Sequence, residues 1–333
     1  MVPYTTTRSP WPHVWAWLLA CATFPLIWVG GFVTTTDAGM AFRDWLTSDG
    51  HFMLAYPWLS SVGDKFVEHG HRLLGALAGF LSIALVVVVW RTESRSWVRK
   101  FSLVILAGVV LQGVLGGMRV VLDERTLALV HGCTGPLFFA LCVAMVVFTS
   151  RWWKEVETSA PTDRSRGIFR LALLCTGLAF AQLVVGAVVR HSPYMIGSTA
   201  SALFQAAVYL HLLLALLIVG HVLLLAWRCI KNRLQVGSGL CLAALVGLQL
   251  LLGAASWVVK YGMPRWATSI AGETTLVNRE ADFAQNAIVT SHVAVGSLIL
   301  VIALAIALRL ARQLGVCAPR LNTGSNRLAG VAL

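Results

Sequence analysis

Eight long apolar segments constrain this chain more than any other feature of its sequence. Each runs for 21 to 24 residues, and a helix of about 20 apolar residues spans the hydrocarbon core of a bilayer, which is ~30 Å thick. The segments are residues 14–34, 67–90, 101–122, 126–149, 168–189, 204–227, 239–259 and 286–308. We therefore predict an all-α integral membrane protein with eight transmembrane helices.

The composition agrees with this fold class and leaves little chain for a soluble domain. Only 12% of the 333 residues are charged, whereas soluble domains carry roughly 25%. The first segment lacks the small-residue pattern of a secretory cleavage site, so we expect it to be retained as a helix. The 13 residues before it are too few for a mitochondrial transit peptide, which favours a bacterial inner membrane.

The distribution of basic residues predicts the orientation of the helices. The N-terminal tail, the connections after the second, fourth and sixth segments, and the C-terminal tail, together with Arg170 at the start of the fifth segment, hold 17 of the 26 Lys and Arg residues. Basic residues concentrate on the cytoplasmic side of membrane proteins, so we expect both termini to be cytoplasmic. The net charge of +12 reflects this bias and indicates no nucleic-acid partner.

The two halves of the chain repeat each other. The third, fifth and seventh segments each contain Gln-x-x-x-Gly, at Gln112/Gly116, Gln182/Gly186 and Gln249/Gly253. Small residues at such positions let membrane helices approach closely. We predict two pseudo-symmetric four-helix bundles, residues 1–155 and 165–315, joined by a cytoplasmic linker at 156–164 and followed by a cytoplasmic tail at 316–333.

Four histidines lie at similar positions in the even-numbered segments: His71, His131, His211 and His292. Each is a few residues from the start of its segment, which places it about 8–10 Å deep at the helical rise per residue. Under the predicted orientation all four lie toward the outer face. An ionisable side chain inside a membrane helix is costly and indicates function.

Two histidines on facing helices of a bundle are typical of a metal or heme site. The sequence contains no Cys-x-x-Cys-His motif, which excludes a c-type heme. A zinc or di-iron site would require more carboxylates at this depth than the single one available, Glu68. We therefore predict two hemes, each held by two histidines.

Glu68 distinguishes one of the four histidines from the others. It precedes His71 by three residues, so the two side chains share one helix face. The residues at the same offset before the other three histidines are Ala128, Val208 and Val289. Electron transfer alone does not require this asymmetry, whereas acid–base or charge-stabilising chemistry does.

Four basic residues at the outer ends of the segments, Arg72, Arg119, Arg190 and Lys260, are candidates for contacts with heme propionates. Snorkelling to lipid headgroups is the alternative role for each of them. The histidines at positions 13, 51, 191 and 221 are expected to be structural, and His69, which lies away from the face of His71, is a weaker ligand candidate. No cysteine falls in an outer connection, so no disulfide is expected there.

The stretch Glu68-His69-Gly70-His71-Arg72-Leu73-Leu74-Gly75 resembles the E-x-x-H-R-x-x-G signature of heme A synthases. The segment from Gly30 to Trp45 resembles the first helix and outer loop of that family, and Gln112 to Gly117 resembles its third helix. The sequence departs from the family at Val293, where many members have arginine after the last histidine.

This resemblance implies an enzyme that oxidises the C8 methyl group of heme O to a formyl group, giving heme A for cytochrome oxidase. It implies that His71 and His131 bind the substrate heme O, that His211 and His292 bind a heme b cofactor, and that Glu68 is the catalytic carboxylate. Heme O synthase and cytochrome oxidase assembly factors are the partners it implies. A diheme b-type electron-transfer protein and a heme transporter or chaperone are the alternative functions, and a homo-oligomer is left open.

Overall fold

The computed structural model describes residues 9–158, 162–192, 198–262 and 282–315. Its long helices are α1 Trp11–Thr35, α2 Gly63–Thr92, α3 Ser96–Val121, α4 Arg125–Thr149, α6 Asp163–His191, α7 Ser198–Lys231, α8 Val236–Tyr261 and α10 Phe283–Gln313. Eight helices in the described part are long and apolar enough to cross a membrane. They coincide with the eight predicted segments, so the predicted fold class is confirmed. The predicted tail at 316–333 lies outside the described residues.

The surface of the helices is apolar, as expected for a protein in contact with lipid. Leu216 on α7 and Leu251 on α8 are each 71% exposed, and Phe80 on α2 is 59% exposed. In water this surface would be a severe aggregation hazard, whereas lipid tails solvate it. The chain is therefore a multi-pass membrane protein.

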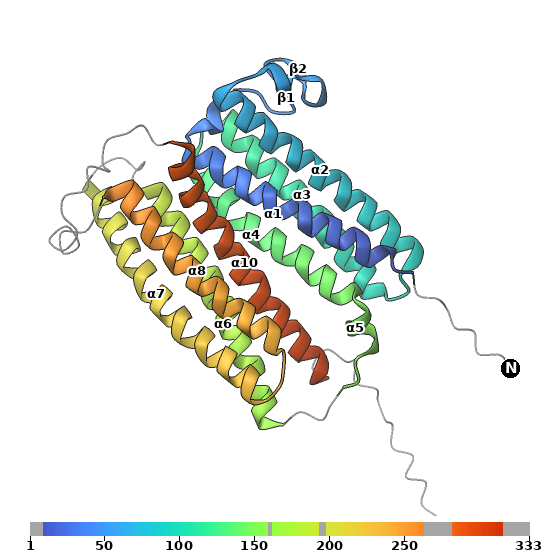
Figure 1. The fold of residues 1–333 in the computed structure, drawn as a ribbon. Coiled ribbons are helices and arrows are strands. Elements are labelled where there is room, and N and C mark those ends of the chain that lie inside the picture. The colour runs from blue at the N-terminus through green and yellow to red at the C-terminus, as the bar shows by residue number, and fades with distance from the viewer. Residues whose placement is uncertain (1–8, 159–161, 193–197, 263–281, 316–333) are drawn as a thin grey trace, which may run out of the picture.

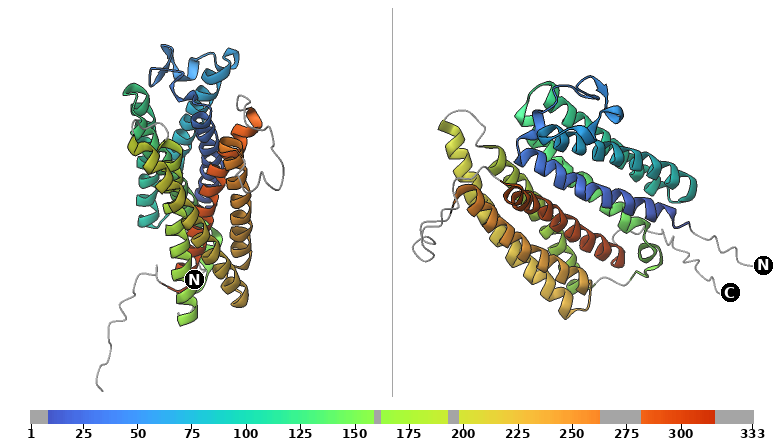
Figure 2. Two further views of the ribbon diagram at one scale, coloured as in Figure 1. Left: turned by 90° about the vertical axis from the view of Figure 1, so that its left-hand side faces the viewer. Right: turned by 45° about the horizontal axis from the view of Figure 1, so that its top comes forward.

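The helices lie in two groups that meet along α4 and α10 (Figure 1). In one group α1 packs against α2 and α4, and α3 packs against α2 and α4; in the other, α6 packs against α7 and α10, and α8 packs against α7 and α10. Helix α10 also contacts α1 and α4, so it passes between the groups (Figure 2). More than half of the apolar window of α4 and of α10 is buried, 56% and 61% respectively. The division into two pseudo-symmetric bundles stays a prediction.

Local sequence explains where several helices begin. The carboxylate of Asp282 accepts the backbone N–H of Gln285 at 2.8 Å, capping α10. Thr162 and Ser165 form a reciprocal capping box at the start of α6, which satisfies backbone donors that the first turn leaves unpaired. The short helix α5, Arg151–Glu155, follows α4.

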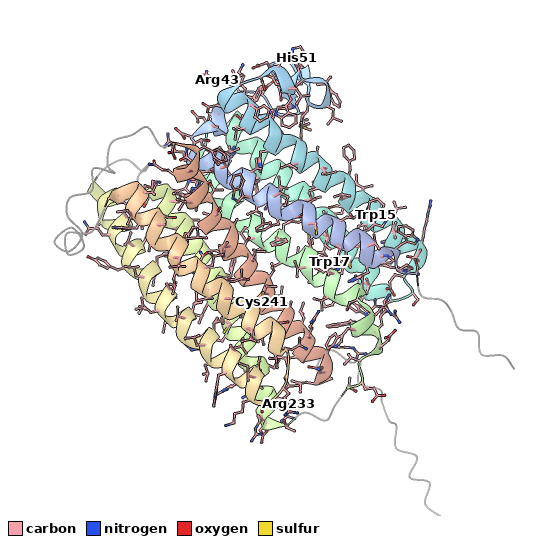
Figure 3. All side chains as sticks on the ribbon, viewed as in Figure 1. Trp15, Trp17, Arg43, His51, Arg233 and Cys241 are labelled. Atoms are coloured by element: carbon pink, nitrogen blue, oxygen red, sulfur yellow. The ribbon has the colours of Figure 1, made fainter. Side chains whose placement is uncertain are left out.

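The connection between α1 and α2, residues 36–62, is the main structured connection in the described chain. It contains the short helices η1 Ala38–Met40, η2 Met53–Ala55 and η3 Trp58–Ser60, and the strands β1 Thr47–Ser48 and β2 His51–Phe52. The strands pair antiparallel through Asp49 and Gly50, both at positive φ, as a two-residue hairpin turn requires. Figure 3 places Arg43 and His51 of this 36–62 segment at one end of the molecule and Arg233 at the other.

The carboxylate of Asp44 stabilises this turn. It accepts the backbone N–H groups of Asp49 at 3.3 Å and Gly50 at 2.9 Å. Partial burial acts to raise the pKa of Asp44, but these hydrogen bonds and one with Thr47 outweigh it and hold that pKa below its usual value.

Candidate heme-binding sites

The fold brings the four predicted histidines together in two pairs. The rings of His71 on α2 and His131 on α4 have centroids 6.4 Å apart and planes at 85°. The rings of His211 on α7 and His292 on α10 have centroids 6.2 Å apart and planes at 67°. Each pair lies within one of the two helix groups, which we name the N-terminal and the C-terminal site.

Both separations suit two imidazoles that share one metal ion. A metal–nitrogen distance of about 2.0 Å on each side of the ion places the ring centres roughly 6 Å apart. The Nδ1 atoms of all four rings are buried and have no hydrogen-bond partner among the described residues. No group of three or more His, Cys, Asp or Glu side chains in the described chain could hold a metal ion. A donor set of two imidazoles at each site therefore fits a heme iron better than zinc or a di-iron centre.

Each of the four rings lies against a glycine of a neighbouring helix. At the N-terminal site, an added Cβ atom would lie 2.7 Å from His71 Cε1 at Gly30 and 3.3 Å from His131 Cε1 at Gly116. At the C-terminal site, it would lie 3.0 Å from His211 Cε1 at Gly186 and 2.9 Å from His292 Cε1 at Gly253. Ordinary carbon–carbon contacts are about 3.5–4.0 Å. Because glycine has no side chain, these four positions leave the space that the imidazoles occupy.

These contacts give the repeated Gln-x-x-x-Gly motif a specific structural role, because its three glycines are the ones that contact His131, His211 and His292. Sequence reasoning missed the fourth glycine, Gly30 on α1. The residue four positions before it is Leu26, so the glutamine that marks the other three is absent. An alignment of the four odd-numbered apolar segments could have identified it, because each of them has a glycine near its outer end.

Glu68 is buried beside the N-terminal site, with 2% of its surface exposed. Its Oε1 accepts bonds from Nη2 and Nε of Arg72 at 2.8 and 3.3 Å, and its Oε2 accepts the backbone N–H of Phe42 at 3.1 Å. Both carboxylate oxygens are therefore held in place. Phe42 belongs to the 36–62 segment, so this loop completes the surroundings of the carboxylate.

Arg72 links Glu68 to the same segment. Its Nη1 donates to the carbonyl oxygens of Asp44 at 2.9 Å and Thr47 at 2.8 Å. Together with the two bonds to Glu68, these contacts use four of the five N–H groups of a guanidinium. The structure thus places this propionate candidate mainly in contact with protein groups.

Further contacts hold the 36–62 segment over the N-terminal site. The indole of Trp45 lies directly over Gly117 of α3, where any side chain would overlap it. His69 is fully buried and hydrogen-bonds through Nδ1 to Ser48 Oγ at 3.0 Å. His69, a weaker ligand candidate in the sequence, therefore holds the loop through this bond.

The other basic candidates lie in different surroundings. Arg119 packs against Gly39 and lies within electrostatic range of His71, His131 and Glu68, so it borders the N-terminal site. Arg190 donates through Nη2 to the Gly31 carbonyl at 2.6 Å and to Thr35 Oγ1 at 2.5 Å, which joins α6 to α1. Lys260 is exposed on α8.

Two further histidines contact protein groups outside both pairs. Nδ1 of His13 hydrogen-bonds to Thr149 Oγ1 at 3.2 Å, and Nδ1 of His221 hydrogen-bonds to the Leu217 carbonyl of its own helix at 2.7 Å. The six described cysteines are free thiols.

Eight helices long and apolar enough to cross a membrane and two pairs of facing histidines define a polytopic membrane protein with two candidate sites for a metal-centred cofactor. The sequence model of the COX15-CtaA family, described as cytochrome oxidase assembly protein, matches residues 60–197. That range contains Glu68, His71 and His131. Over that range, which is 138 of its 333 residues, the chain is similar to this family.

Curated relatives carry the name heme A synthase. The chain is 27% identical over 320 residues to the one from Caulobacter vibrioides, covering 77% of this chain and 90% of that protein. It is 23% identical over 209 residues to the one from Hyphomonas neptunium, covering 54% of this chain and 59% of the relative. It is 25% identical over 182 residues to the one from Geobacillus kaustophilus, covering 53% of this chain and 56% of the relative. The chain thus spans little more than half the length of two of these three relatives.

Proposed function

We propose that this protein is a heme A synthase, a membrane oxidoreductase that converts the C8 methyl group of heme O into the formyl group of heme A for cytochrome oxidase. The match of residues 60–197 to the COX15-CtaA family model supports this activity, as do the curated relatives that carry that name. The observation that carries the proposal is the buried carboxylate of Glu68, which stands one helical turn from His71 and has no counterpart at the C-terminal site among the described residues.

In this proposal the two sites have different roles. His71 and His131 hold the substrate heme O, and His211 and His292 hold a heme b cofactor. When bound, heme b would supply a one-electron carrier. The position of Glu68 supports the assignment, because it is the only carboxylate within one helical turn of a histidine ligand in the described residues and it marks the site where chemistry requires one.

Glu68 would act on charge that develops while the methyl carbon is oxidised. Its hydrogen bonds to Arg72 and to the Phe42 N–H fix both oxygens, so the carboxylate needs no reorientation to stabilise positive charge or to accept a proton. Electrostatic interactions are stronger in a water-poor interior than in water. Trp45 and the rest of the 36–62 segment would keep bulk water from this end of the site.

We place the enzyme in a bacterial inner membrane with both termini cytoplasmic and both heme sites toward the outer face. The excess of Lys and Arg in the even-numbered connections and the tails supports this orientation. Heme O would come from heme O synthase in the same membrane, and heme A would pass to the assembly machinery of cytochrome oxidase.

The proposal is tested by replacing Glu68 with glutamine in cells that supply heme O. We expect the variant to retain bound heme but to form heme A at least ~100-fold more slowly, the usual scale for losing an acid–base group. The measurement is extraction of the pigments from the purified protein, followed by mass determination. Asp64→Asn is the matched control, because Asp64 is an exposed acid on the same helix. Unchanged heme A formation in Glu68→Gln would contradict the assignment.

A further inference from the structure

The two sites differ in how neighbouring helices hold the histidine ligands. At the C-terminal site, Nε2 of Gln182 on α6 donates to the backbone carbonyl of His211 at 3.0 Å. Nε2 of Gln249 on α8 donates to the backbone carbonyl of His292 at 2.9 Å. Each ligand helix is thus bonded to a neighbouring helix at the ligand residue itself.

At the N-terminal site, no glutamine of the described chain donates directly to the carbonyl of a histidine ligand. Gln112 on α3 donates to Thr134 Oγ1 at 2.6 Å. The Thr134 hydroxyl in turn donates to the carbonyls of Val130 at 2.7 Å and of His131 at 3.3 Å within its own helix. On α1, the corresponding residue is Leu26, whose side chain has no donor. The carbonyls of His71 and His131 are therefore not held by a side-chain amide.

Local packing allows the glutamine contact at His292. Gly296 follows His292 by one helical turn, and a Cβ atom there would lie 3.4 Å from Gln249 Nε2 and 3.1 Å from Leu183 Cδ2. A carbonyl can only accept, so the amide must direct its nitrogen toward the histidine. The Oε1 atoms of Gln182 and Gln249 are buried without a partner in the described chain. Burying an unpaired acceptor is costly. The hydrogen bonds that the Nε2 atoms donate to the histidine carbonyls therefore account for the positions of these amides.

We infer that Gln182 and Gln249 are positioning residues that fix His211 and His292 and thereby make the heme of the C-terminal site the retained one. The N-terminal site, without these bonds, is the one from which heme exchanges. Groups that orient metal ligands from outside the ligand set typically change metal affinity by 10–100-fold. The inference rests on the proposed function, because it requires heme at both sites.

The test uses the purified full-length protein loaded with heme. In Gln182→Met and Gln249→Met, methionine preserves side-chain length but removes the donor. We expect heme b to leave the C-terminal site roughly tenfold faster in each variant, measured as transfer to excess apomyoglobin. We also expect the electron paramagnetic resonance g values of its ferric low-spin signal to shift. A general loss of stability would not move those g values while the heme is still bound. Gln112→Met is the matched control and should leave both readouts of the C-terminal site unchanged.

The converse variant adds the missing bond. Gly75, one turn after His71, has open space where a side chain would begin, and Leu26→Gln would place an amide donor on α1. We expect this variant to slow release of heme from the N-terminal site.

Wild-type release rates and g values in both glutamine variants would overturn the inference. Because Gln182 and Gln249 act on different helices, either variant tests it if the other fails to fold. Absence of heme from the wild-type protein would overturn the proposed function as well, whereas unchanged release from a heme-loaded protein overturns only this inference.

Discussion

Substitution of Gly253 by alanine tests whether the glycines set the positions of the histidine rings. The new Cβ atom would lie 2.9 Å from Cε1 and 3.5 Å from Nδ1 of His292. The shorter distance is roughly 0.6 Å below the usual contact limit. Either the ring or α8 must therefore move, and overpacking of this kind typically costs about 1–3 kcal/mol.

A displaced His292 ring would change its distance from the His211 ring, which is 6.2 Å between centroids and is suited to two imidazoles that share one iron. Binding sites tolerate displacements of only about 0.5 Å, and each ~1.4 kcal/mol changes affinity tenfold. We therefore expect Gly253→Ala to weaken heme binding at the C-terminal site by roughly 5- to 150-fold. The assay is heme b content and release rate after purification, together with the optical spectrum of the remaining heme.

Gly247→Ala is the matched control on the same helix. A Cβ atom there meets nothing within 4 Å, and alanine is a better helix former than glycine by up to about 1 kcal/mol. This variant should bind heme as the wild type does and be equally or more stable to heat. Wild-type heme content and release in Gly253→Ala would refute the view that the glycine determines where the ring lies.

Two further predictions concern the 36–62 segment and its contacts. Arg72→Ala would leave the carboxylate of Glu68 buried without its ion pair, so we expect a loss of about 3–5 kcal/mol in stability. Lys65→Ala, which breaks the exposed pair with Asp49, should cost less than about 1 kcal/mol; thermal unfolding in detergent compares the two, and equal losses would contradict the reasoning. Because the pKa of Asp44 is lowered in the folded state, its contribution to stability is present above the usual aspartate pKa and is lost as the pH falls through the folded-state value. Wild-type melting temperature should therefore fall more steeply below about pH 4 than that of Asp44→Asn, and identical pH profiles would show that the carboxylate does not stabilise the turn.

Local sequence was sufficient to predict the eight helices. A membrane helix needs a continuous apolar run of fixed minimum length because its backbone must satisfy its own hydrogen bonds in lipid. The positions of His71, His131, His211 and His292 within those runs singled them out, and helical periodicity placed Glu68 on the face of His71. These conclusions depend only on residues close together in the chain.

The contacts around each histidine could not be predicted in the same way. Gly30 lies against His71, and Gly253 lies against His292, because of how neighbouring helices are rotated and how closely their axes approach. Arg72 was a propionate candidate in the sequence, but the folded 36–62 segment directs its guanidinium to carbonyls of Asp44 and Thr47. The position of that loop depends on contacts between distant residues, which no local pattern records.

The sequence by itself therefore determined the class of fold, the four ionisable residues in the membrane and the single carboxylate beside one of them. Only the tertiary structure decided what holds each ligand in place: a glycine behind every ring, and a glutamine on the backbone of His211 and His292. The physical reason is that hydrophobic periodicity specifies which face of a helix is apolar, whereas the packing of side chains between helices specifies which residues meet.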